Sequence, residues 1–286
     1  MTEILTWNIQ CGLGVDGRVD LDRIAAIIRS MGDANVICLQ EVCRHMPELD
    51  GGAGSDQASL LAGLFPDHEP YFGAGPDRIA GRGRGDERAS FGNMILSRLP
   101  VLSVFRHPMP QPAAAGIKHM PRQATEVTVA TPTGPLRVVT THLEYHARAH
   151  RLAQIERLRA LHFEAAANVM HPPAQAGGPY EPLERPVEMV LCGDFNFDPK
   201  GAEYAGLLAP FDDGVPALSD GWRAVHGERP HEPTCGVHDH KQWPQGKHCR
   251  DFFFVTPDVR ARATAIHVNV DTNASDHQPL LLTLSD

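Results

Sequence analysis

The sequence predicts one α/β domain that spans residues 1–286. Two stretches have the apolar spacing of helices with one buried face, and short apolar runs before, between and after them are typical of strands covered on both faces. Hydrophobic residues make up 42% of the chain and charged residues 21%, which is the composition of a folded globular protein. A chain of this length can bury one large core, so no second domain is needed to explain it.

The first elements are a strand, a helix and a second strand. Residues 4–9 form an apolar run that we expect to be a strand. Apolar side chains in 21–31 recur with helical spacing, and Asp20 is placed to cap that helix. Residues 35–42 are almost continuously apolar, so we expect a buried strand with Glu41 at its carboxyl end.

The remaining elements are shorter, except for one long helix. We expect a helix over 147–170 because its apolar residues follow one face. Segment 171–186 contains too many prolines and glycines for regular structure, but we do not interpret it as a linker between domains. The strands expected in the rest of the chain are 93–97, 124–130, 136–143, 187–193, 251–255 and 279–284.

Charge and cysteine content limit the environment and the partners. The formal net charge is −9, so any binding of nucleic acid would need a local basic patch or a bound cation. The six cysteines are scattered, mostly in apolar runs, and we expect reduced thiols. The amino terminus has no basic segment followed by a cleavage site, and no run reaches the roughly 18 apolar residues of a membrane span. We therefore expect a cytoplasmic protein.

Polar side chains stand where many of these strands end. They are Asn8, Glu41, His142, Asp194 with Asn196, Asp251, and Asp276 with His277. Polar groups at strand ends collect at one edge of a sheet, so we expect them to converge. Carboxylate and amide oxygens suit hard cations such as Mg²⁺ or Mn²⁺, and a nearby imidazole can transfer protons. The set predicts metal-assisted hydrolysis of a phosphoester.

A series of short motifs contains these positions: Trp7-Asn8-Ile9, Gln40-Glu41-Val42, Gly92-Asn93-Met94-Ile95-Leu96-Ser97, Thr141-His142-Leu143, Gly193-Asp194-Phe195-Asn196, Arg250-Asp251-Phe252 and Ser275-Asp276-His277. In this order they resemble the motifs of the endonuclease/exonuclease/phosphatase superfamily, from residue 4 to about residue 284. The joint occurrence carries the argument, because each motif alone is as typical of an ordinary turn or strand end.

The resemblance implies a four-layered α/β sandwich, in which two mixed β-sheets pack face to face with helices on the outside. It also implies an enzyme, a Mg²⁺- or Mn²⁺-dependent phosphoric ester hydrolase. Asn8 and Glu41 would bind the metal, with Asp276 nearby. The resemblance leaves open whether one or two metal ions take part.

The same resemblance implies catalytic roles for the other positions. Asp194 and Asn196 would orient the water and the phosphoryl oxygens, and His142 would contact the phosphate or act as general acid. The base can be either Asp194 or His277. We favour His277 held by Asp251, because a carboxylate behind an imidazole fixes its tautomer and stabilises the imidazolium.

The substrate class depends on which branch of the superfamily the chain is closest to. Abasic-site endonucleases carry Tyr where this chain has His142, so the chain resembles the deoxyribonuclease and sphingomyelinase branches more. Arg122 resembles a family arginine near the site, and we expect it to bind the substrate phosphate. We expect a phosphodiester (or a phosphomonoester), with a small-molecule or lipid diester favoured. The alternatives are a nuclease acting on DNA or RNA and a catalytically inactive interaction module.

Segment 226–249 is rich in histidine and cysteine. Cys235, His238 and Cys249 could supply a tetrahedral zinc site. Their spacing is irregular, so we favour a substrate-facing or solvated loop without structural zinc.

Segment 73–92 is expected to be a loop because it is rich in glycine and arginine. Its arginines are Arg78, Arg82, Arg84 and Arg88. They are more typical of a solvated loop than of a lid that contacts an anionic substrate.

Overall fold

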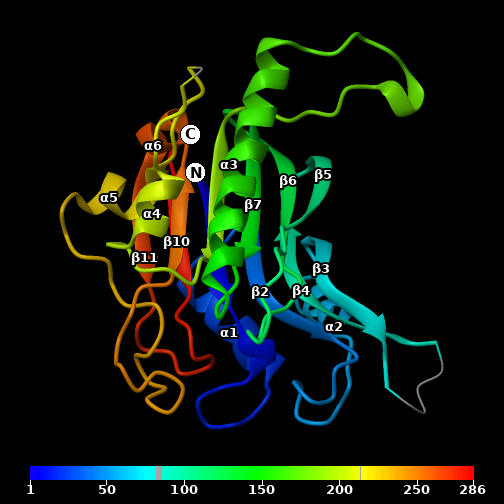
Figure 1. Cartoon of the computed structure of the whole chain (residues 1–286), viewed down its shortest axis with the longest axis vertical. Helices are drawn as coiled ribbons and strands as arrows, with labels where there is room; N and C mark the ends of the chain where they lie inside the picture. The colour runs from blue at the N-terminus through cyan, green and yellow to red at the C-terminus, as the bar shows by residue number, and fades with distance from the viewer. Residues whose placement is uncertain (82–85, 213) are drawn as a thin grey trace.

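Two β-sheets pack face to face in the computed structural model, which describes residues 1–81, 86–212 and 214–286 (Figure 1). The first sheet contains β1 (Thr2–Asn8), β2 (Val36–Arg44), β3 (Glu69–Ile79), β4 (Arg88–Ser97), β11 (Ala263–Val268) and β12 (Leu280–Leu284). The second contains β5 (Val101–Pro108), β6 (Gln123–Thr131), β7 (Gly134–His142), β8 (Met189–Asp194), β9 (Ser219–Asp220) and β10 (Asp251–Val255).

Both sheets are six-stranded and mixed. The first has the order β11-β12-β1-β2-β4-β3, and the second has the order β5-β6-β7-β8-β10-β9. Strand β1 runs parallel to β2, and β7 runs parallel to β8, whereas the other pairs are antiparallel. The helices are α1 (Leu21–Met31), α2 (Gln57–Leu64), α3 (Arg148–Met170), α4 (Ala202–Leu207), α5 (Gly221–His226) and α6 (Pro257–Arg262).

Successive side chains of the central strands point to opposite faces of their sheet, and this separates the layers of the sandwich. Ile4 and Cys38 face the second sheet and pack in the core between the sheets. Leu5 and Leu39 point the other way and pack against α1 and α2. Helix α3 covers the outer face of the second sheet through a separate apolar cluster, as its place beside β7 in Figure 1 shows. The four-layered sandwich predicted from the sequence is confirmed.

The two long helices lie where the sequence predicted them. Helix α1 begins after Asp20, whose Oδ1 accepts a hydrogen bond from the Arg23 backbone N–H at 2.8 Å. This confirms Asp20 as the cap. Helix α3 begins at Arg148, one residue after the predicted start, and ends at Met170.

The prediction of a loop over 73–92 is wrong, because most of this segment lies in β3 and β4, which pair as a hairpin. Its glycines permit close strand contact: a side chain at Gly92 would collide with the Gly73 carbonyl. Arg78 pairs with Glu48, and Arg88 with Asp77. The two arginines Arg82 and Arg84 lie outside the described residues.

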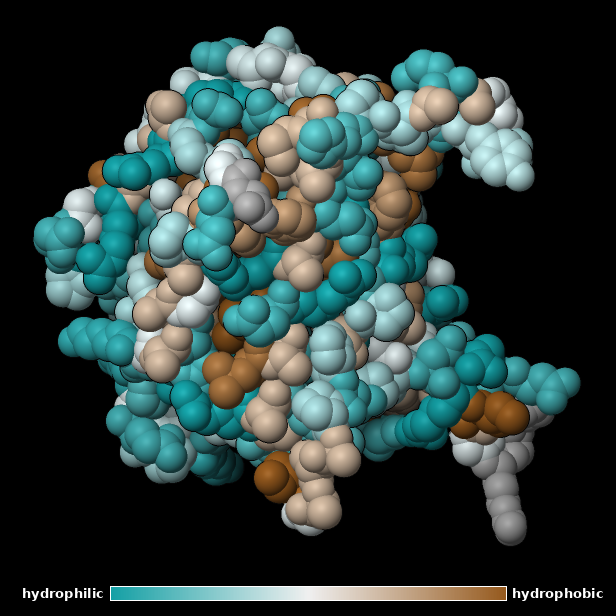
Figure 2. All heavy atoms as spheres, turned by 45° about the horizontal axis from the view of Figure 1, so that its top comes forward, coloured by the Kyte–Doolittle hydropathy of each residue, from teal (hydrophilic) through white to brown (hydrophobic). Residues whose placement is uncertain are grey.

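Segment 171–186 leaves the end of α3 as an arm with a short 3₁₀ turn at Gly178–Tyr180. Figure 2 shows the arm standing away from the body of the molecule. It returns the chain to β8, which pairs with β7 in the same sheet.

The six cysteines are free and buried, as expected for reduced thiols. Among the described residues, no helix has both the length and the apolar character that crossing a bilayer requires.

Candidate active site

The candidate site lies at one end of the central strands. Strand register puts Asp194, the last residue of β8, opposite His142 on β7 and opposite Asp251 on β10. Gly193 makes this close pairing possible, because its φ is +131° and a Cβ there would collide with the Thr141 carbonyl. Three of the predicted site residues therefore meet through sheet pairing alone.

Glu41 reaches the site through an irregularity in β2. The predicted strand ended at Glu41, but β2 continues to Arg44 and its register with β4 shifts between Leu39 and Val42. Glu41 lies in this bulge with φ of +57°, in the left-handed region that non-glycine residues rarely adopt. Such strain is typical of functional positions, where it turns a side chain toward the site.

Asn8 connects the two sheets at the floor of the site. Its Nδ2 donates to Glu41 Oε1 at 3.1 Å and to Asp194 Oδ2 at 3.0 Å. Its Oδ1 accepts from the Gln10 backbone N–H, so the amide orientation is defined by three partners. Asn8 thus brings a carboxylate from each sheet to one point.

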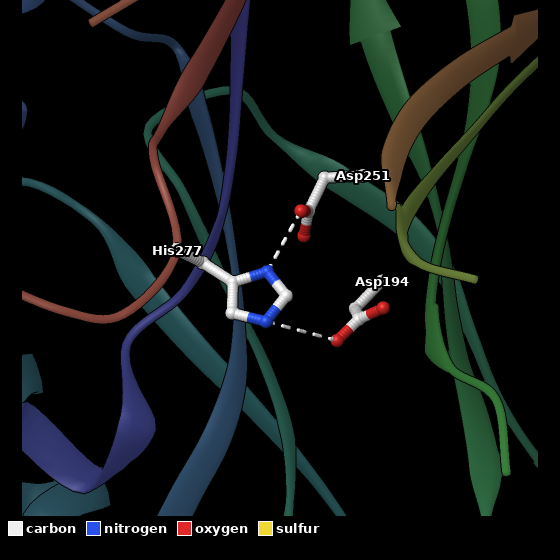
Figure 3. Close-up of side chains that lie close together, drawn as sticks. All are labelled: Asp194, Asp251 and His277. Atoms are coloured by element: carbon white, nitrogen blue, oxygen red, sulfur yellow. Dashed lines mark hydrogen bonds and ion pairs between the residues drawn. The ribbon is translucent and has the colours of Figure 1, made fainter. Parts of the chain in front are cut away.

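His277 and Asp251 form a buried pair (Figure 3). The His277 Nδ1 lies 2.8 Å from Asp251 Oδ2, which also accepts the Thr234 hydroxyl at 2.6 Å. The His277 Nε2 faces Asp194 Oδ2 at 3.6 Å. Burial lowers the pKa of His277, but the charges of Asp251, Asp276 and Asp194 outweigh it and raise the pKa well above its usual value. Without a cation the ring therefore keeps a proton on both nitrogens near neutral pH, and it becomes a base only when a bound cation offsets these carboxylate charges.

The pKa values of Asp194 and His142 are shifted in opposite directions. Burial is the main cause that raises the pKa of Asp194 to about 6, although His277 opposes it. Burial, with Arg122 and His277 nearby, holds the pKa of His142 well below its usual value. The His142 Nε2 lies 3.4 Å from Asp194 Oδ2, and its Nδ1 has no hydrogen-bond partner among the described residues. A neutral His142 can donate one hydrogen bond at the site.

Asn196 also lies at this end of β8, in the left-handed region with φ of +53°. Its backbone N–H donates to Asp194 Oδ1 at 2.9 Å, and its Nδ2 donates to the Leu143 carbonyl at 2.9 Å. Asn196 lines the cavity, but its amide hydrogen-bonds the protein backbone. It therefore fixes the turn that presents Asp194.

Asp276 is held by two residues that the sequence pattern did not predict. Its Oδ2 accepts from Gln242 Nε2 at 2.8 Å and from Trp243 Nε1 at 3.1 Å. Both donors belong to the irregular segment 226–249, and both line the cavity. No repeat or motif marks them in the sequence.

The zinc ligands considered in 226–249 interact elsewhere. His238 Nε2 lies 2.8 Å from the Val270 carbonyl, and the thiols of Cys235 and Cys249 face backbone carbonyls. Among the described residues, one group of His, Cys, Asp and Glu side chains is close enough to hold a metal, and it consists of Asp194, Asp251 and His277.

Arg122 is buried beside the site with an unused donor. Its Nε lies 3.4 Å from Glu144 Oε2, and no partner for its Nη1 lies within the described part of the chain. Glu144 also accepts from the Met120 and His146 backbone N–H groups, which fixes the carboxylate. Glu144 was not among the predicted site residues; its place directly after Thr141-His142-Leu143 is a signal that could have identified it, because a buried acid needs partners.

These groups open into a cavity of about 600 Å³. All the predicted site residues except Asn8 and Asp251, which lie behind the lining, contribute to its surface. The predicted site residues that line the cavity are Glu41, Arg122, His142, Asp194, Asn196, Asp276 and His277. A phosphate group occupies only a small part of this volume.

The acidic residues fit a divalent cation. Burial and the charge of Asp276 raise the pKa of Glu41 to about 7, although its side chain is 25% exposed at the cavity. Carboxylates that repel each other in a partly open site are stabilised by a cation with oxygen ligands. Glu41 and Asp276 present such oxygens to the cavity, whereas Asn8 lies behind them with its Oδ1 bound to the Gln10 backbone N–H. Asp194, Asp251 and His277 form a second cluster.

The fold and this constellation define a class of α/β-sandwich proteins with a polar site at the strand ends. The chain belongs to the Endonuclease/Exonuclease/phosphatase family, whose sequence pattern matches residues 5–277. Members of this family are metal-dependent phosphoesterases. No curated protein matches the sequence.

Solved structures share this architecture. An endonuclease/exonuclease/phosphatase from Beutenbergia cavernae DSM 12333 is 26% identical, with a TM-score of 0.69 over 98% of this chain and 70% of that one. The mannosyl-6-phosphatase Bt3783 of Bacteroides thetaiotaomicron VPI-5482 is 15% identical, with a TM-score of 0.68 over 100% of both chains. D. rerio TDP2 complexed with single strand DNA product is 18% identical, with a TM-score of 0.63 over 100% of this chain and 99% of that one. The last two show likeness of fold alone.

Proposed function

We propose that this protein hydrolyses a small phosphodiester with the help of a divalent cation. The observation that carries the proposal is the meeting of two unlike groups at one cavity. The buried His277–Asp251 pair provides an imidazole for proton transfer, and the Glu41 and Asp276 carboxylates provide oxygen ligands. Hydrolysis of a phosphoester needs both functions.

His277 would act as the general base in this proposal, once a bound cation offsets the charges of Asp276 and Asp194 that raise its pKa. Asp251 fixes Nδ1 as the protonated nitrogen of the neutral ring and stabilises the imidazolium once Nε2 takes a proton. Asp194 lies on the Nε2 side, 3.6 Å away, where it can accept a hydrogen bond from the attacking water. Asn196 keeps Asp194 in that position.

Glu41 and Asp276 would hold the cation, and Asn8 would orient Glu41 through its Nδ2. When bound, Mg²⁺ or Mn²⁺ offsets the negative charge of the phosphoryl group. Gln242 and Trp243 keep Asp276 oriented toward the cavity through their hydrogen bonds to Oδ2.

Arg122 and His142 would bind the phosphoryl oxygens. The Arg122 Nη1 is a buried donor without a partner in the described residues, and a phosphate oxygen would satisfy it. His142 is neutral because burial lowers its pKa, so it would donate a hydrogen bond to a second oxygen rather than protonate the leaving group.

A small diester is favoured over a long polynucleotide. The net charge is −9, and Arg78 and Arg88 at the β3–β4 hairpin already pair with Glu48 and Asp77. A polynucleotide binds through several Lys or Arg contacts to successive phosphates, and among the described residues the cavity is lined by one arginine, Arg122, and one lysine, Lys118. Nuclease activity is the alternative function to test, because the structurally similar D. rerio TDP2 was solved with a single strand DNA product.

The test measures hydrolysis of bis-p-nitrophenyl phosphate, p-nitrophenyl phosphate, an oligonucleotide and plasmid DNA with Mg²⁺, with Mn²⁺ and with EDTA. KM is then measured over a salt series at fixed Mg²⁺. We expect the diester to be the better substrate, with a slope of log KM against log[salt] of about one or less. A slope of about four with the oligonucleotide, together with its higher kcat/KM, would identify a nuclease. Full activity in EDTA after dialysis would refute the metal requirement.

A further inference from the structure

Part of the cavity lining is apolar and takes no part in the proposed chemistry. We call it the apolar wall and define it as Met46, Leu49, Pro76, Phe91 and Met120. These residues come from the segment between β2 and α2, from β3 and β4, and from the segment before β6.

The apolar wall is packed before any substrate binds. Met46 and Phe91 belong to an apolar cluster that also contains the buried Cys11 and Cys43 thiols, and Met120 packs against this cluster. Met46 is 5% exposed and Phe91 is 9% exposed, so the protein already holds them in place. A packed apolar surface that faces a cavity favours an apolar occupant, because a polar group placed there would lose hydrogen bonds to water.

The apolar wall adjoins the phosphate-binding side chains. Pro76, Phe91 and Met120 share a small void with Arg122 and His142, next to the main cavity. A phosphate bound to Arg122 Nη1 would therefore have one substituent within reach of the wall. The backbone N–H of Met120 and the Nε of Arg122 bind the same Glu144 carboxylate, which fixes the wall and the arginine relative to each other.

We propose that the substrate carries an apolar substituent on one ester oxygen, and that this substituent packs on the apolar wall while Arg122 binds the phosphate. The inference rests on the proposed phosphoesterase function for the charged group, and it adds the class of the substituent. A sugar, or the next nucleotide of a polymer, would place hydroxyls or a second phosphate against the five wall side chains, which offer no hydrogen-bond partners, and would have to reach Lys118, His119 or Tyr145 elsewhere in the lining.

The probes are methyl-, butyl- and octylphosphonic acid, which present the same charged group with apolar chains of increasing length. Their dissociation constants are measured by calorimetry with the full chain and Mg²⁺. Burial of one methylene strengthens binding by about three- to fourfold, so we expect butylphosphonate to bind at least about tenfold more tightly than methylphosphonate. The octyl compound should bind at least as tightly as the butyl compound.

Two variants test whether the dependence of binding on alkyl chain length comes from the apolar wall. Leu49→Ser is chosen because Leu49 is 39% exposed, so the change is tolerated in folding. Met120→Gln removes apolar character next to Arg122 without removing volume. Each should reduce the ratio of the methyl to the octyl dissociation constant at least about threefold. Leu102→Ser is the matched control, because Leu102 is 45% exposed on β5 and does not line the cavity, and it should keep the wild-type ratio.

A ratio near one in the wild type would overturn the inference, as would equal loss of the ratio in Leu49→Ser and Leu102→Ser. Hydrolysis of methyl and octyl p-nitrophenyl phosphate is measured on the same samples. Hydrolysis without dependence of binding on chain length would overturn the inference and leave the proposed function standing. Dependence on chain length without hydrolysis of any diester would support the apolar site and refute the proposed function.

Discussion

The His277 imidazole is held by Asp251 through a contact of 2.8 Å between Nδ1 and Oδ2. Asp251 belongs to β10 of the second sheet, whereas His277 lies in the segment between β11 and β12 of the first sheet. The pair therefore connects the two sheets at the site. Trp7 supports it from β1, since its Nε1 donates to the His277 carbonyl at 2.9 Å.

Replacement of His277 tests the role of the imidazole. We expect His277→Ala to lower kcat on the best diester by at least about 100-fold, because loss of a general base removes a contribution of this size. Asp251→Asn should lower kcat more than it changes KM, since Asp251 acts through His277. His226→Gln is the control, because His226 binds the Ile266 carbonyl away from the cavity. A folded His277→Ala protein with more than about a tenth of the wild-type kcat would refute the assignment.

Replacement of Glu41 tests the cation site. We expect Glu41→Gln to raise the Mg²⁺ concentration for half-maximal activity at least about tenfold, because a neutral amide binds a hard cation more weakly than a carboxylate does. Titration of activity with Mg²⁺ measures this. Glu203→Gln is the matched control, since Glu203 pairs with Arg148 and Arg151 and does not line the cavity. An unchanged Mg²⁺ requirement in Glu41→Gln would place the cation elsewhere, with Asp194, Asp251 and His277 as the next candidates.

Replacement of Arg122 and of Glu144 tests phosphate binding, because Glu144 is expected to act by positioning Arg122. We expect Arg122→Lys to raise KM for the diester at least about tenfold, because an ammonium cannot reproduce the planar guanidinium that contacts Glu144 and leaves Nη1 for the phosphate. Glu144→Gln should raise KM by a smaller factor with less effect on kcat. Steady-state kinetics separate the two parameters. A loss confined to kcat in both variants would instead assign Arg122 to the chemical step.

A buried ionic cluster under α3 predicts how stability depends on pH. Burial raises the pKa of Glu126, but hydrogen bonds from His107 and Arg185, with the charge of Arg137, lower it to about 2. The folded-state pKa thus lies below the unfolded value, so Glu126 stabilises the fold above pH ~4.5, and this contribution is lost as the pH falls toward 2.

Urea unfolding between pH 7 and pH 3 measures this effect. We expect the free energy of unfolding of the wild type to fall below about pH 5 and that of Glu126→Gln to fall less steeply. Glu164→Gln is the control, because Glu164 also pairs with Arg185 but its side chain is 49% exposed. The same steepness in all three proteins would show that Glu126 does not control acid stability.

The sequence alone determined the central strands, the two long helices and the set of polar side chains at the site. These features depend on local information. A strand covered on both faces needs an apolar run, and a helix with one buried face needs apolar residues at its own period, so residues 35–42 and 21–31 were identifiable without knowledge of their partners. The order of motifs with Asp194 and His277 was likewise readable along the chain.

The tertiary structure decided how those side chains are aimed and which residues support them. The bulge at Glu41 is a shift in the pairing of β2 with β4. The hairpin of β3 with β4 needs glycines, because a side chain there would collide with the partner strand, and this need follows only from the pairing of the two strands. Gln242 and Trp243 hold Asp276 from a loop without any periodicity. The apolar wall likewise combines segments that are far apart along the chain. Contacts of this kind depend on long-range packing, which the pattern of neighbouring residues does not encode.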